Sequence, residues 1–224
     1  MELTHKRIFF LFPGQGAQYP GMALDFLAAG SPGLRKLFDL ASDIMGKNME
    51  TLLRDTDAET LTRTDISQPA LTLANLAAAA YLADQGIRPA ACAGFSLGEY
   101  AALAVSGIIG EEDCFRLVKA RGEAMQAAAD RIAAEAAGEA PDAATSPGVA
   151  VSPGVAVSPG MAAVIGLPPE QAEALIAQWT AGGLAGLYPA NINSPRQLVV
   201  SGTAPALAEA ETRFKEAGAR RFIR

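Results

Sequence analysis

The sequence contains few of the residues that build metal sites and disulfide frameworks. Its 224 residues include two cysteines, Cys92 and Cys114, and a single histidine, His5. The cysteines have no metal-binding spacing, so we expect no metal site and no disulfide, but two packed thiols in a reducing cytoplasm. No apolar run approaches the ~18 residues of a membrane-spanning helix, so we expect no membrane partner.

Excess positive charge is also missing. Eighteen lysines and arginines face 24 aspartates and glutamates, which gives a net charge of −6. The sequence has no basic cluster and no interleaved aromatic and basic residues, so we expect no nucleic-acid binding. Lys215, Arg220, Arg221 and Arg224 form the one local basic group that we consider for an acidic partner. The alternative for this group is a solvated face at a helix end.

A serine in G-x-S-x-G spacing is the most informative motif. Gly94-Phe95-Ser96-Leu97-Gly98 follows the apolar run Ala90–Ala93 and precedes the helix-forming run Glu99–Val105. In a nucleophile elbow a strand turns sharply into a helix, and small residues on either side of the serine prevent clashes. The motif therefore predicts a nucleophilic Ser96, with a tight turn of no catalytic role as the alternative.

A second motif lies near the N-terminus. The continuous apolar run Ile8–Phe12 precedes the glycine-flanked loop Pro13-Gly14-Gln15-Gly16. Continuous apolarity is typical of a parallel strand that is buried on both faces, and ligands of open α/β sheets gather beyond the carboxyl ends of such strands. We therefore expect the Gln15 loop and the Ser96 elbow to share one crevice.

The remaining patterns predict three segments. Alternating strands and helices over residues 1–134 indicate the N-terminal part of a large α/β subdomain, including helices at 70–84 and from 111 to about 134. Residues 135–160 are rich in Ala, Gly, Pro and Ser and repeat Ser-Pro-Gly-Val-Ala-Val, which predicts a flexible linker. A β-solenoid is the alternative there. Residues 161–224 show a βαββαβ order, which indicates a ferredoxin-like subdomain.

Together, several short motifs resemble one enzyme family. The sequence is similar to malonyl-CoA:acyl-carrier-protein transacylases of fatty-acid synthesis and to the related polyketide acyltransferases. The resemblance covers the chain from about Arg7 onward and rests on motifs in the family's order: 12–18, Gln68-Pro69-Ala70, 94–100, Arg121-Gly122 and 191–195. It implies an α/β-hydrolase-like large subdomain with a parallel sheet and a nucleophile elbow, into which the ferredoxin-like small subdomain is inserted.

The resemblance also implies a reaction and its residues. A malonyl group would pass from CoA to the phosphopantetheine thiol of acyl carrier protein through a malonyl ester of Ser96, without a metal or redox cofactor. The backbone N–H groups of Leu97 and Gln15 would stabilise the oxyanion. The guanidinium of Arg121, on a predicted helix, would hold the malonyl carboxylate, since its planar fork fits a carboxylate. An exposed surface charge is the alternative for Arg121.

Three further residues are candidates for substrate contact. Met125 lies on the same predicted helix as Arg121, and Asn191 and Asn193 follow a predicted strand in an Asn-x-Asn-Ser-Pro pattern. Asparagines before proline also form turns, so a purely structural role is the alternative for both.

The general base of this chemistry is not apparent in the sequence. His5 precedes the first predicted strand, which places it about 16–20 Å from the carboxyl ends where the elbow opens. In the resembling family the catalytic histidine follows the ferredoxin-like unit, so we expect this chain to be truncated and to lack its base. Two rival functions are a serine thioesterase or esterase with the same elbow, and a non-catalytic module that binds acyl carrier or acyl-CoA.

Overall fold

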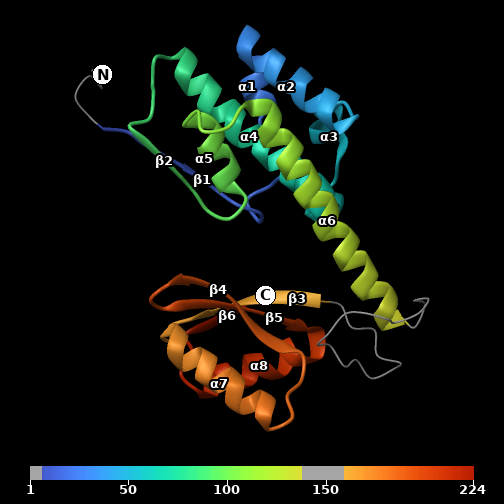
Figure 1. Ribbon diagram of the computed structural model, residues 1–224, viewed down its shortest axis with the longest axis vertical. Coiled ribbons are helices and arrows are strands. Elements are labelled where there is room, and N and C mark those ends of the chain that lie inside the picture. The colour runs from blue at the N-terminus through green and yellow to red at the C-terminus, as the bar shows by residue number, and fades with distance from the viewer. Residues whose placement is uncertain (1–6, 138–158) are drawn as a thin grey trace. The chain divides into compact units, whose positions relative to one another are not determined.

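The computed structural model describes residues 7–137 and 159–224, so His5 and most of the predicted linker lie outside the described residues. The chain divides after residue 127 into two compact units. Figure 1 shows helices and a small sheet in the first unit, and a sheet with two helices in the second.

A two-stranded parallel sheet lies at the centre of the first unit. β1 (Phe9–Phe12) pairs in parallel with β2 (Ala91–Gly94), and Phe12 is the partner of Gly94. Because both strands run in the same direction, the loops that follow them leave from the same edge of the sheet. The protein thus has an α/β fold with a parallel sheet, as the motif context predicted. The helical segments described in this unit are α1 (Leu24–Ala28), α2 (Pro32–Met45), α3 (Met49–Asp55), the 3₁₀ helix η1 (Thr60–Thr62), α4 (Thr64–Asp84), α5 (Gly98–Val105) and α6 (Glu111–Ala137), which continues past residue 127.

Helix α4 forms most of the core of this unit. Its leucines and alanines are buried on several sides, including Leu73 and Ala77 with no exposed surface. Phe10 and Phe12 of β1 point into the same apolar cluster, and Phe38 of α2 and Phe115 of α6 are almost fully buried in it. A helix that is buried on nearly all sides has little amphipathic pattern, so its polar residues require a specific explanation.

Helix α4 begins earlier than the sequence predicted. The expected helix started at Ala70 because a proline usually disrupts the interior of a helix. The structure begins the helix at Thr64 and keeps Pro69 inside it, where it is buried. The Thr64 backbone N–H donates to Gln126 Oε1 at 2.9 Å, and its hydroxyl donates to the Gly122 carbonyl at 3.0 Å. These tertiary bonds to α6 anchor the first turn and offset the bond that Pro69 removes.

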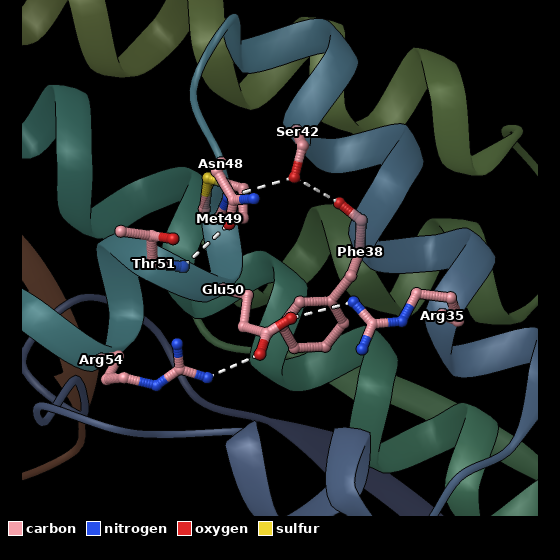
Figure 2. A network of polar contacts seen from close by, with 8 residues as sticks. All are labelled: Arg35, Phe38, Ser42, Asn48, Met49, Glu50, Thr51 and Arg54. Carbon is pink, nitrogen blue, oxygen red and sulfur yellow. Dashed lines mark hydrogen bonds and ion pairs between the residues drawn. The ribbon is translucent and has the colours of Figure 1, made fainter.

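The corner between α2 and α3 is fixed by a polar network (Figure 2). Ser42 Oγ donates to the Phe38 carbonyl at 2.7 Å and accepts from the Met49 N–H at 3.0 Å. Asn48 caps α3 by accepting from the Thr51 N–H at 2.8 Å. A capped helix start satisfies an N–H that would otherwise lack a partner.

The second unit has an antiparallel sheet with two helices. The order along the chain is β3 (Pro159–Ile165), α7 (Pro169–Ala181), β4 (Leu187–Ser194), β5 (Gln197–Thr203), α8 (Ala204–Glu216) and β6 (Arg221–Ile223). The strands lie in the order β4-β5-β3-β6. The strand and helix order read from the sequence is therefore confirmed for this region, and Phe214 of α8 packs edge-on against Trp179 of α7 in its core.

The start of β3 differs from the prediction. β3 begins at Pro159, inside the last partial copy of the repeat, where the sequence predicted a linker. Pro159 pairs with Thr203 of β5, whereas β6 pairs with β3 only from Ala163 onward. At Pro159 one side of β3 is therefore an edge, which is where a strand tolerates proline.

Candidate active site

Ser96 has the backbone of a nucleophile elbow. Its φ is +51°, a left-handed conformation that is rare for a residue with a side chain and costs about 1–3 kcal/mol. β2 ends at Gly94 and α5 begins at Gly98, so the chain reverses within a few residues around the serine. Ser96 is exposed, whereas the neighbouring Leu97 is almost fully buried. The serine hydroxyl is thus accessible at the end of a strand and directly before a helix.

Gly94 and Gly98, on either side of Ser96, must be glycines because neither position has room for a side chain. A Cβ on Gly94 would lie 2.1 Å from the Gly98 carbonyl carbon, and a Cβ on Gly98 would lie 2.1 Å from the Phe12 carbonyl oxygen. Neither glycine has a positive φ. The requirement is therefore close approach of three backbone segments, as the G-x-S-x-G spacing predicted.

The Gln15 loop lies directly against the elbow. A Cβ on Gly14 would meet the Phe95 carbonyl oxygen at 2.4 Å, and the Phe95 N–H donates to the Phe12 carbonyl at 3.0 Å. The shared location of the two loops, which the sequence predicted, is thus confirmed by these contacts. Gln15 itself is exposed, and the loop is stabilised by a bond of 2.7 Å from the Gly16 N–H to Gln18 Oε1.

Two backbone donors beside the serine are available. Within the described part of the chain, neither the Leu97 N–H nor the Gln15 N–H donates to another protein group. The N–H groups around Leu97 also belong to the N-terminus of α5, where the helix dipole favours negative charge. Free amides at this position can stabilise an oxyanion.

Arg121 and Met125 are neighbours on one side of α6, one turn apart. Arg121 is half-buried and makes no hydrogen bond or ion pair with any described residue. Met125 is partly exposed, and its sulfur accepts from Gln68 Nε2 of α4 at 3.1 Å. The sequence analysis named Gln68 only within the Gln68-Pro69-Ala70 motif and not as a site residue, because the predicted helix began after it, at Ala70.

The two predicted asparagines lie in the second unit. The sequence placed them after a strand, but β4 continues through both to Ser194, so that expectation was wrong. A two-residue turn at Pro195 and Arg196 closes the hairpin. Asn191 pairs with Val199 of β5, whereas Asn193 lies at a register shift between Ile192 and Ser194. Asn191 is exposed and lines a hollow beside Glu173 of α7, while Asn193 is half-buried.

The cysteines do not offer a second nucleophile. Cys114 is fully buried and donates to the Tyr100 carbonyl at 3.4 Å. Burial, with a smaller contribution from the Glu111 carboxylate, raises the pKa of the Cys114 thiol to about 12. Burial also raises the pKa of Cys92. Both are therefore protonated thiols at neutral pH, and a thiol is a poor nucleophile.

Residues 7–137 and 159–224 contain no candidate metal site and no candidate membrane-spanning helix. No group of three or more histidines, cysteines and carboxylates there could hold a metal ion. No helix in this part of the chain is long and apolar enough to cross a membrane.

Comparison with known proteins assigns the chain to a family. It is 36% identical to the malonyl CoA-acyl carrier protein transacylase of Bacillus subtilis strain 168, over 97% of this chain and 60% of the relative. It is also 36% identical to the malonyl CoA-acyl carrier protein transacylase of Escherichia coli strain K12, over 96% of this chain and 60% of the relative. The chain thus spans about 60% of the length of these relatives.

Solved structures show the same likeness. The transacylase from Coxiella burnetii superposes with a TM-score of 0.75 at 31% identity, over 98% of this chain and 61% of that one. A type II polyketide acyl-carrier protein in complex with its malonyl-transacylase gives a TM-score of 0.71 at 31% identity, over 97% of this chain and 62% of the matching one. These likenesses confirm the resemblance found in the motifs. Residues 9–187 match the family described as the acyl transferase domain, and the chain therefore belongs to that family.

Proposed function

We propose that the protein transfers a malonyl group from malonyl-CoA to the phosphopantetheine thiol of acyl carrier protein. The observation that carries the proposal is the exposed Ser96 in a strained left-handed conformation, at a turn where glycines admit no side chain. Strain that the surrounding structure maintains is typical of a functional residue. The names of the relatives supply the acyl donor and acceptor.

In the proposed reaction Ser96 Oγ attacks the thioester carbonyl of malonyl-CoA. The carbonyl oxygen becomes an oxyanion that accepts hydrogen bonds from the Leu97 and Gln15 N–H groups, each donor being worth ~10²–10³ in rate. The carbon–sulfur bond then breaks, CoA leaves as a thiol, and a malonyl ester of Ser96 is formed. The thiol of the carrier protein attacks this ester, which regenerates the serine.

A base must accept the Ser96 proton in the first step and return it to the departing thiolate. The single histidine, His5, lies outside the described residues. We propose that a group outside the described residues accepts and returns this proton. Without a base, an elbow of this kind retains only the catalysis of the oxyanion donors and of binding.

Arg121 is the proposed anchor of the malonyl carboxylate. Its guanidinium is half-buried and has no protein partner among the described residues, so it is available to a ligand anion. Met125 is proposed to contact the same acyl group, because it lies one turn away on α6. Asn191 and Asn193 are proposed to contact the substrate from β4.

The finer organisation is part of the same proposal. Residues 1–134 would form the N-terminal part of an α/β-hydrolase-like subdomain, 135–160 a linker, and 161–224 an inserted ferredoxin-like subdomain. The sheet order β4-β5-β3-β6 supports the last assignment. A cytoplasmic location fits the role of Cys92 and Cys114 as protonated, packed thiols.

Mass spectrometry of the protein after incubation with malonyl-CoA tests the proposal. A malonyl adduct on the peptide that contains Ser96 is expected, and the variant Ser96→Ala should carry none. An undiminished adduct in Ser96→Ala would place the nucleophile elsewhere. If the adduct forms but free malonate is released at the same rate with and without carrier protein, the protein is a hydrolase. A protein that binds malonyl-CoA without forming an adduct is a binding module.

A further inference from the structure

Helix α4 has a stripe of polar side chains among mostly apolar, buried residues. We define the α4 stripe as Thr64, Gln68, Thr72 and Asn75, which fall within an arc of about 80° on a helix with 3.6 residues per turn. Gln68 and Thr72 have no exposed surface, and Asn75 is 6% exposed. Buried polar groups are unfavourable unless they have partners, so the contacts of this stripe indicate its purpose.

The N-terminal end of the α4 stripe holds the part of α6 that carries Arg121. Thr64 binds the Gly122 carbonyl and the Gln126 side chain, as described above. A Cβ on Gly122 would lie 2.7 Å from the Thr64 carbonyl oxygen, so the two helices touch through their backbones at this point. Arg121 therefore projects from a segment of α6 that cannot rotate or slide without breaking these contacts.

The other end of the α4 stripe holds the loop of the proposed oxyanion donor. Asn75 Nδ2 donates to the Pro13 carbonyl at 3.1 Å, and Gln15 follows two residues later. Thr64 and Asn75 are 11 residues apart, which is about 16 Å along a helix axis. One helix thus sets the distance between the Gln15 loop and the Arg121 segment.

Gln68 lies between these two ends and is not explained by packing. Its Nε2 donates to Met125 Sδ at 3.1 Å, although a thioether is a weak acceptor. Its Oε1 has no hydrogen-bond partner in the described part of the chain. A leucine would fill a similar volume without an unsatisfied atom, so the amide is unfavourable for folding alone.

We infer that Gln68 is a positioning residue for acyl selectivity that acts through Met125, an inference that rests on the proposed function. A methionine side chain has three rotatable bonds and adapts to many shapes. Binding its sulfur to a fully buried amide restricts it to one position, one turn from Arg121. The acyl pocket then has a fixed wall beside the guanidinium, so a malonyl carboxylate meets Arg121 in one orientation.

A double-mutant cycle tests whether Gln68 acts through Met125. The variants are Gln68→Leu, Met125→Leu and the double variant, and the measured quantity is the preference for malonyl-CoA over acetyl-CoA in binding titrations. Each single change should lower this preference about tenfold, and the double variant should lower it no further than either one. An unchanged preference in Gln68→Leu, or losses that simply add, would overturn the inference. Thr72→Val is the matched control, because it removes a buried, partnerless hydroxyl from the same stripe and should leave the preference unchanged.

A second measurement is independent of malonyl binding. The methyl groups of the six methionines can be labelled with ¹³C and observed by NMR, with the Met125 signal assigned from Met125→Leu. Gln68→Leu should shift and sharpen this signal because the side chain becomes mobile, and Thr72→Val should not affect it. An unmoved signal in Gln68→Leu overturns the inference whatever the substrate. A moved signal supports the restraint on Met125, and if the unmodified protein then shows no malonyl preference, it is the proposed function that fails.

Discussion

The glycines around Ser96 are needed for space and not for an unusual backbone angle. Gly94, Gly98 and Gly14 each approach the carbonyl group of another segment so closely that a methyl group could not fit. Backbone atoms cannot move aside as a flexible side chain can. These positions therefore link the stability of the unit directly to the geometry of the elbow.

Gly98→Ala should lower the free energy of unfolding by about 1–3 kcal/mol, the usual effect of overpacking a dense site. The added methyl group would lie 2.1 Å from the Phe12 carbonyl oxygen. Gly33→Ala is the control, since Gly33 lies in α2, lacks a positive φ and has only Ser31 Oγ nearby, at 3.6 Å. That change should stabilise by about 0.5–1 kcal/mol. Urea unfolding of both variants measures the difference, and equal stability would show that the elbow is looser than described.

Arg121→Ala should weaken the use of malonyl-CoA by on the order of 100-fold while sparing acetyl-CoA. The reason is that an acetyl group has no carboxylate to pair with the guanidinium. Arg121→Lys should recover only part of the loss, since an ammonium group cannot form the two parallel hydrogen bonds of a guanidinium. Rates of transfer from both donors to carrier protein test this. Equal losses for malonyl and acetyl transfer would place the carboxylate anchor elsewhere.

Among individual residues, the sequence correctly predicted the local geometry of those that occur in short motifs. The elbow geometry of Ser96 and the position of the Gln15 loop beside it follow from local spacing, and both are present in the structure. The contact between Gln68 and Met125 joins residues 57 positions apart. No local pattern encodes such a pairing, because it depends on how α4 packs on α6.

Among the elements, the corner between α2 and α3 depends on one carboxylate. Glu50 of α3 binds Arg35 of α2 at 2.9 Å and Arg54 of its own helix at 2.6 Å (Figure 2). The hydrogen bond from Arg35, followed by that from Arg54, lowers the pKa of Glu50 below its ordinary value of 4.5. In the folded state the two arginines therefore stabilise the ionised carboxylate of Glu50 relative to its protonated form.

Glu50→Gln should destabilise the protein at neutral pH but not in acid. A carboxyl whose folded pKa is lowered contributes stability above its unfolded pKa, and this contribution is lost as the pH falls from 4.5 through the lowered value. The difference in unfolding midpoint between Glu50→Gln and the unmodified protein should shrink over that range. Glu112→Gln, which breaks an exposed ion pair within α6, should have a smaller effect at neutral pH. A difference that stays constant below pH 4.5 would contradict this account.

Element boundaries were predictable except where tertiary contacts override local preference. The helix of residues 111–137 and the hairpin of the second unit follow from periodicity, and their limits agree within a few residues. The start of α4 was missed because Thr64 is anchored by α6, and the short helix α3 was missed because its start is set by Asn48 and Ser42. The proline rule alone placed the start of α4 wrongly.

At the scale of the molecule, the parallel sheet of the first unit has one open face. Along β1, Phe10 and Phe12 are 8% and 6% exposed, whereas Phe9 and Leu11 are 59% and 77% exposed. Parallel sheets are normally covered on both faces, and continuous apolarity predicted the same here. The observed alternation shows that, in the described part of the chain, helices cover only one face.

The open face should make the chain of 224 residues self-associate, because exposed apolar surface favours contact between copies. Leu11→Lys should reduce this association with little change in unfolding free energy, since the side chain is already exposed. Phe12→Ala should cost about 3–5 kcal/mol, because it empties a buried site on the opposite face. Sedimentation velocity at several concentrations measures the first effect and urea unfolding the second. If Leu11→Lys is as destabilising as Phe12→Ala, then Leu11 is covered in solution and this face of the sheet is not open.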